Sequence, residues 1–143
     1  MSSAGGRTID VPVLKGFWKA GPAAARRGAV LVSLTDFQVG RFRDLPRIAV
    51  AAFRIRHNWQ RRQGSLGLTL WIQPLRRRLG SLSAWEGEED LARWLRSDDH
   101  LQVVHRFKGR MRNVSSETWT TTEDFTVADA WLEAGRRRAG PDD

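Results

Sequence analysis

Large aliphatic side chains occupy every second position of one short segment, and this alternation constrains the fold more than any other feature. The four residues are Leu66, Leu68, Leu70 and Ile72. Because successive side chains of a β-strand point to opposite faces, the pattern predicts a strand over 66–72 with one buried face. A second short strand is predicted over 79–85, beyond Pro74 and a basic turn, close enough to pair with the first as a hairpin.

Helical and strand-like segments flank this hairpin on both sides. In chain order they are 29–37 (strand), 44–63 (helix), 86–112 (helical, with a break and a new cap at Ser97) and 116–125 (strand). We therefore predict an α+β fold, the ferredoxin-like βαββαβ arrangement, with a four-stranded antiparallel sheet and two helices on one face. The capping-box-like pair Thr126 and Asp129 predicts a short extra helix near the C-terminus.

The 143 residues suffice for one domain. We expect an N-terminal arm over 1–28, rich in glycine, alanine and serine, and a folded domain over 29–135. The segment 136–143 is expected to be a charged, frayed tail.

The composition excludes several chemistries. The chain has no cysteine and no tyrosine, which rules out disulfides, thiolate metal sites and cysteine nucleophiles. Its three histidines lack metal-ligand spacing, so we predict no metal site. No segment is apolar enough to span a membrane and the N-terminus lacks an apolar signal region, so we expect a cytoplasmic protein with no membrane partner.

Charge is distributed unevenly. Residues 41–80 contain ten arginines and one acid, whereas 81–100 contain six acids and two arginines. Such a surface is simply solvated, binds a polyanion, or pairs with itself across a dimer. The strand predicted over 79–85 lacks the aromatic, glycine-flanked signature of RNA-recognition domains. We therefore do not expect nucleic acid as the partner, and keep an arginine-rich nucleic-acid-binding module only as an alternative.

The second face of the predicted sheet needs a cover, because it carries tryptophan beside serine and threonine. Three of the seven tryptophans, Trp71, Trp85 and Trp119, fall on predicted strands, with Ser83 nearby. A second copy of the sheet would form a homodimeric barrel, whereas single-stranded nucleic acid would stack on the rings. We favour the homodimer, with these four residues lining a cavity that holds a flat aromatic or polyene molecule by stacking and hydrogen bonds.

One region carries a family resemblance. It comprises Ser81–Glu86, Glu88–Leu91, Trp94–Leu95, Ser97–His100 and Val104–Arg106. These segments resemble the third strand and second helix of the dimeric α+β barrel superfamily, which includes antibiotic-biosynthesis monooxygenases, spheroidene-monooxygenase-like proteins and haem-degrading monooxygenases. The order of elements agrees over 29–125. The resemblance implies a monooxygenase-like homodimer acting on a hydrophobic small molecule. A non-oxidative ligand binder, or a cyclase or isomerase, remains the alternative on the same fold.

The resemblance also implies site residues. His100 is similar to the histidine that opens the second half of this helix in spheroidene-monooxygenase-like proteins, and His105 follows it on the same predicted helix. Either would be the acid–base group, and His105 would be the iron ligand if haem is used. His57, on the first helix, is expected to line the pocket. We expect either no cofactor, which we favour, or haem.

Overall fold

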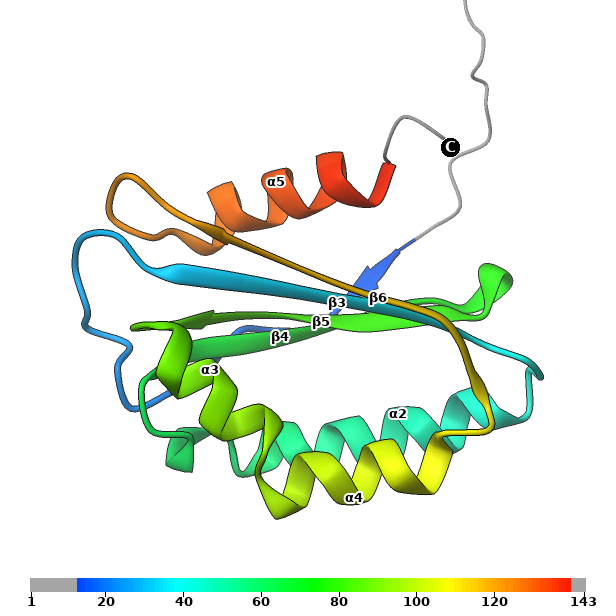
Figure 1. Ribbon diagram of the computed structural model, residues 1–143. Helices are drawn as coiled ribbons and strands as arrows, with labels where there is room; N and C mark the ends of the chain where they lie inside the picture. Colours follow the sequence, from blue (N-terminus) through cyan, green and yellow to red (C-terminus); the bar gives the residue numbers. More distant parts are fainter. Residues whose placement is uncertain (1–12, 140–143) are drawn as a thin grey trace, which may run out of the picture.

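A computed structural model describes residues 13–139, which form one antiparallel sheet with helices on both faces (Figure 1). The strands are β1 (Leu14–Lys15), β2 (Lys19–Ala20), β3 (Leu31–Val39), β4 (Ser65–Gln73), β5 (Arg78–Trp85) and β6 (Met111–Thr120). The helices are α2 (Asp44–His57), α3 (Glu88–Leu95), α4 (Asp98–Phe107) and α5 (Val127–Ala139), with short 3-10 turns at Trp59–Arg61 and Pro74–Arg76.

The topology confirms the predicted ferredoxin-like arrangement. The strand order is β1-β4-β5-β3-β6, with β2 also paired to β4, and β4 and β5 form the expected hairpin. The helices α2, α3 and α4 cover one face of the sheet (Figure 1). The break between α3 and α4 lies where it was predicted, since the Ser97 hydroxyl accepts a hydrogen bond from the His100 amide at 3.3 Å.

The aliphatic row of β4 faces these helices over most of its length. Leu68, Leu70 and Ile72 pack in the clusters that contain residues of α2, α3 and α4. Leu66 instead joins the cluster on the opposite face. The pairing of β4 with β5 shifts register between Ser65 and Gly67. A bulge of this kind reverses the side-chain alternation. Three of the four predicted aliphatic side chains therefore share the helix-covered face, and Leu66 does not.

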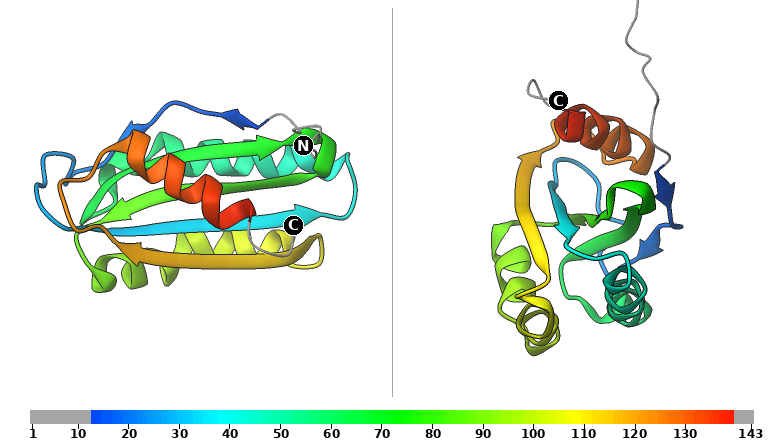
Figure 2. Two further views of the ribbon diagram at one scale, coloured as in Figure 1. Left: turned by 90° about the horizontal axis from the view of Figure 1, so that it is seen from above. Right: turned by 90° about the vertical axis from the view of Figure 1, so that its right-hand side faces the viewer.

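The opposite face of the sheet is crossed by α5 of the same chain (Figure 2). Ala130 and Ala134 of this helix are buried against Val30, Val32 and Leu34 of the β3 segment. The helix begins as predicted, because the Thr126 hydroxyl accepts a hydrogen bond from the Asp129 amide at 3.2 Å. It continues to Ala139, into the segment expected to be a frayed tail. The cover that was expected from a second sheet or from nucleic acid is thus supplied by α5.

The N-terminal arm protects one edge of the sheet. Within its described part, β1 and β2 pair with β4, and the Thr69 hydroxyl donates to the carbonyl oxygen of Gly16 at 2.8 Å. Trp18 packs on Phe125 with ring centroids 5.4 Å apart, whereas Phe17 is exposed. Positions 1–12 of the predicted arm and 140–143 of the predicted tail lie outside the described residues.

The last strand lies earlier in the chain than predicted. The expected strand was 116–125, whereas β6 is Met111–Thr120. Its pairing with β3 shifts register between Asp36 and Gln38, and Asn113 has a positive φ of 51°.

Between residues 13 and 139, no helix is both long enough and apolar enough to cross a membrane.

Candidate functional site

Three tryptophans gather between the sheet and the helices. Trp59 lies in the turn after α2, Trp85 ends β5 and Trp94 is on α3. The ring centroid of Trp59 is 5.5 Å from that of Trp85 and 4.9 Å from that of Trp94, both in edge-to-face contact. The indole nitrogens of Trp59 and Trp85 donate to the hydroxyls of Ser65 and Ser83 at 2.7 and 2.9 Å. This cluster is therefore a packed, hydrogen-bonded core, with Trp85 and Ser83 inside it.

His100 lies at the margin of this cluster. Its ring makes an edge-to-face contact with Trp94 at 5.2 Å. Its Nδ1 atom is 3.0 Å from the carbonyl oxygen of Leu95. Because a carbonyl only accepts, Nδ1 carries the proton in the neutral ring and Nε2 keeps its lone pair. Burial lowers the pKa of His100, and the hydrogen bond to Leu95 only partly opposes this effect. The ring is thus suited to accept a proton at Nε2.

We predict that His100 titrates below its ordinary pKa of 6.5. Because the unfolded chain then binds a proton more readily than the folded one, the stability contributed by the neutral ring is fully present above 6.5. It is lost as the pH falls through the folded pKa. Two-dimensional NMR titration measures the pKa, and urea unfolding at neutral and acidic pH measures the stability. His100→Gln will reduce the acid sensitivity of unfolding, with His105→Gln as the exposed control. A His100 pKa at or above 6.5 would contradict the prediction.

The other two histidines lie at the surface. His57, at the C-terminal end of α2, and His105, in the last turn of α4, are both exposed. Leu101 and Val104, which share the helical stripe of His105, are exposed as well. None of the three histidines lines the two pockets described below, one at each end of β6.

The remaining two predicted tryptophans lie on the α5 face. Trp71 is buried beneath the guanidinium of Arg138, whose Cζ is 4.8 Å from the centroids of both Trp71 and Trp131. Trp119 is half-buried, with Cζ of Arg137 4.3 Å from its ring centroid. Burial lowers the pKa of Arg138. Two arginines of α5 thus cover two tryptophans of the sheet.

A pocket of about 280 Å³ opens beside Trp119, at the C-terminal end of β6. It is lined by Trp119, Thr120, Thr121, Thr122, Glu123, Asp124, Phe125, Thr126, Asp129, Ala130, Glu133 and Arg136. The hydrogen bond from Arg136 lowers the pKa of Glu133 and favours its ionised form. The pocket therefore combines one indole, four threonine hydroxyls, four carboxylates and the guanidinium of Arg136. We call it the β6–α5 pocket.

The structure divides the predicted site residues between two sides of the sheet. Trp85, Ser83 and His100 belong to the helix side, whereas Trp71 and Trp119 belong to the α5 side, so they do not line one cavity. Sequence reasoning missed the part of the β6–α5 pocket that α5 contributes. The threonine run next to Trp119 was the available signal, but nothing local indicates that α5 folds back over it.

The pockets at the two ends of β6 do not have a donor set that matches haem. A haem iron needs an axial ligand beside a cavity, and the lining of these two pockets has no histidine, cysteine or methionine. Nor do residues 13–139 contain a group of three or more histidine or acidic side chains arranged to hold a metal ion.

Comparison with solved structures identifies the fold. A protein from Nitrosomonas europaea, proposed to be an antibiotic-biosynthesis monooxygenase, superposes with a TM-score of 0.56 at 13% identity, over 68% of this chain and 92% of that one. A Shewanella oneidensis protein has a TM-score of 0.59 at 12% identity, over 68% of this chain and 95% of that one. A proposed monooxygenase from Lactobacillus acidophilus has a TM-score of 0.55 at 8% identity over 69% of this chain. The present chain spans only about half (54%) of the length of that Lactobacillus protein.

The sequence itself matches no family model and no curated protein. About a third of the chain has no counterpart in the Nitrosomonas structure. The arm strands and α5 are additions to the βαββαβ core that runs from β3 to β6. At these identities the likeness concerns the fold, and the chain accordingly has the ferredoxin-like α+β fold of antibiotic-biosynthesis-monooxygenase-like proteins.

Proposed function

We propose that this protein is a monooxygenase-like protein that binds a flat, electron-rich aromatic molecule in the β6–α5 pocket. The observation that carries the proposal is the half-buried indole of Trp119 beside a run of threonine hydroxyls, on a fold shared with monooxygenase-like proteins. The volume of about 280 Å³ is near the lower end of small-molecule sites and suits one or two fused rings.

The chemistry of the wall favours a phenol or hydroquinone. An aromatic ring stacks on Trp119, whose orientation is held by Arg137 at 4.3 Å. A phenolic hydroxyl of the ligand donates to the ionised carboxylate of Glu133. Such a ligand is also electron-rich enough to give electrons to oxygen by itself, which oxygenation without a cofactor requires. We derive no step through haem.

Substitution of Trp119 tests the proposed site. We expect Trp119→Ala to weaken binding of 1-naphthol, followed by fluorescence, by about tenfold, because a stacked aromatic contact contributes about 0.5–1.5 kcal/mol beyond its buried area. Trp131→Ala is the matched control, since Trp131 is also half-buried and also stacked by an arginine, but lies outside the pocket. Equal affinities of the two variants would refute the site.

Oxygen uptake separates the two activities possible on this fold. With 1,4-dihydroxynaphthalene, a monooxygenase-like protein will catalyse oxygen consumption above the uncatalysed rate. At a subsaturating concentration, Trp119→Ala will lower this excess rate about tenfold, in line with its weaker binding. Binding without oxygen uptake would identify the non-oxidative ligand binder, cyclase or isomerase instead.

We further propose that the chain forms a homodimer through β6. The arm covers the β4 edge of the sheet, whereas β6 ends the sheet of residues 13–139 and is exposed over most of its length. Long exposed edge strands pair readily with another chain. Exposed apolar side chains lie on β6 and on the neighbouring α4, namely Val114, Leu101 and Val104. A dimer through β6 leaves α5 in place, which closure of a barrel over the α5 face would not.

We expect wild type to sediment as a dimer and Leu101→Lys/Val104→Lys to weaken association at least tenfold, since burying each side chain contributes about 1.5–3 kcal/mol. Sedimentation equilibrium over a range of concentrations measures this. The control, Val50→Lys/Leu132→Lys, adds the same charges at exposed positions of α2 and α5. A monomeric wild type would contradict the proposal.

A further inference from the structure

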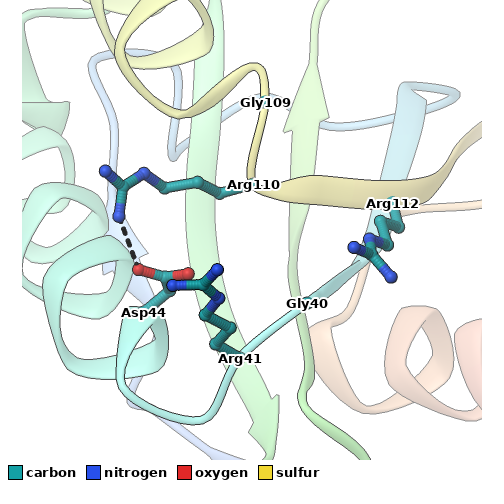
Figure 3. A pocket seen from close by; sticks show the side chains of 6 residues that line it. All are labelled: Gly40, Arg41, Asp44, Gly109, Arg110 and Arg112. Carbon is teal, nitrogen blue, oxygen red and sulfur yellow. Dashed lines mark hydrogen bonds and ion pairs between the residues drawn. The ribbon is translucent and has the colours of Figure 1, made fainter.

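A second pocket, of about 250 Å³, lies at the opposite end of β6 (Figure 3). Two chain segments meet there, the turn from β3 into α2 and the turn from α4 into β6, and the Gly40 amide donates to the Arg110 carbonyl oxygen at 3.2 Å. The pocket is lined by Gly40, Arg41, Asp44, Gly109, Arg110 and Arg112. We call it the arginine pocket. It is separated from the β6–α5 pocket by most of the length of β6, roughly 30 Å for a ten-residue strand.

One of the three arginines is held by an ion pair, and a second lies close to the backbone of Gly40. Nη1 of Arg110 is 2.7 Å from Oδ1 of Asp44, whose side chain is buried in the first turn of α2. The guanidinium of Arg112 lies against Gly40, since a Cβ atom added there would be 3.2 Å from Cζ, Nε and Nη2. Figure 3 shows Arg41 and Arg110 directed toward Asp44, with Arg112 beyond Gly40. Arg110 is therefore placed before any ligand arrives, which lowers the entropic cost of binding for that group.

The pocket carries an excess of positive charge. Three guanidinium groups and one carboxylate line it, which gives a net charge of +2. Arg41 and Arg112 have no ion pair with any acid among residues 13–139, whereas other arginines, such as Arg62 and Arg78, pair with aspartates. Because like charges gathered in a pocket repel one another, a bound anion would stabilise this arrangement.

We propose that the arginine pocket binds the terminal phosphate of a small phosphorylated molecule. A phosphate monoester is a compact dianion at neutral pH, which matches the excess charge, and its oxygens accept hydrogen bonds from several guanidinium forks at once. Gly109 has no atom within 4 Å of the position that a Cβ would take, so that wall of the pocket is open to the rest of the ligand.

A single phosphate group fits this site better than a nucleic-acid backbone does. A phosphodiester carries one charge per phosphate and is bound by cations spread along an open surface. Here the charge is concentrated in one concavity between two turns. The site is independent of the β6–α5 pocket, so failure of either proposal leaves the other standing.

Calorimetric titration with phenyl phosphate and with inorganic phosphate tests the inference. We expect saturable binding to wild type and a loss of affinity of at least tenfold in Arg41→Gln/Arg112→Gln, because hydrogen bonds to charged groups contribute about 1.5–3 kcal/mol each. The matched control is Arg47→Gln/Arg54→Gln, which removes the same charge from α2 outside the pocket and will bind like wild type. Both substituted pairs are at the surface, so both variants are expected to fold, which circular dichroism will verify.

A single-stranded oligonucleotide without terminal phosphates forms the second arm. One outcome is that the oligonucleotide binds with a steep salt dependence and that the pocket variant and the control variant lower its affinity equally. In that case the anion is bound by the basic surface in general, and the phosphate site is refuted. Absence of saturable binding at millimolar phosphate or phenyl phosphate refutes it as well. Tighter binding of phenyl phosphate than of inorganic phosphate identifies a monoester as the ligand, whereas the reverse order would overturn the assignment to a phosphorylated molecule.

Discussion

Replacing Trp85 by alanine will lower the free energy of unfolding by about 3–5 kcal/mol, the usual cost of truncating a buried tryptophan. The side chain is completely buried, and it packs on Trp59 at 5.5 Å in the helix-side core. The substitution leaves a cavity between β5 and the helices, and it removes the donor that hydrogen-bonds to Ser83. For a domain whose whole stability is about 5–15 kcal/mol, such a loss brings the chain close to unfolding.

Urea unfolding followed by far-ultraviolet circular dichroism measures this loss. Phe17→Ala is the control, because that ring is 88% exposed and its removal is expected to change stability by no more than about 0.5 kcal/mol. The result also bears on function. A loss below about 1 kcal/mol would indicate that Trp85 is not a core residue, and would reopen its predicted role in ligand binding.

Replacing Gly80 by alanine will destabilise the protein by about 1–3 kcal/mol or more, through overcrowding at the centre of the sheet. A Cβ atom at Gly80 would overlap the carbonyl oxygen of Thr35 and lie 2.7 Å from Cζ2 of Trp71. The Thr35 oxygen belongs to the backbone of β3, which pairs with β5, so it cannot move without disturbing that pairing. The absence of a side chain at Gly80 leaves room for the ring of Trp71, which also contacts Arg138.

Thermal and urea unfolding of Gly80→Ala and Gly109→Ala provide the test. Gly109 has open space where a Cβ would be, so its alanine variant is expected to stay within about 0.5 kcal/mol of wild type. Similar stabilities for the two variants would show that the sheet adapts to a side chain at Gly80.

Much of the core topology was predictable because its signals are local. The alternation in β4, the turn before β5 and the caps at Ser97 and Thr126 each depend on a few neighbouring residues. Backbone geometry and side-chain hydrogen bonding act over that range. The βαββαβ order follows from those elements alone.

Boundaries were less predictable where distant strands determine the pairing. Nothing between 111 and 115 reads as a strand by itself, yet β6 begins at Met111, because its backbone pairs with Val39 of β3. Phe125 was expected in the strand, but it packs on Trp18 of the arm. In both cases the partner lies more than sixty positions away in the sequence.

The candidate site also depends partly on local sequence signals and partly on contacts between distant residues. The sequence alone determined the fold class, the tryptophan-rich strands and the concentration of arginine between 41 and 80, because these are properties of composition and local pattern. Only the tertiary structure decided that Trp85 faces the helices while Trp119 faces α5, and that Arg41, Arg110 and Arg112 meet in one pocket. The side of a strand on which a residue lies depends on register, which one bulge reverses, and a pocket depends on turns that only the folded chain brings together.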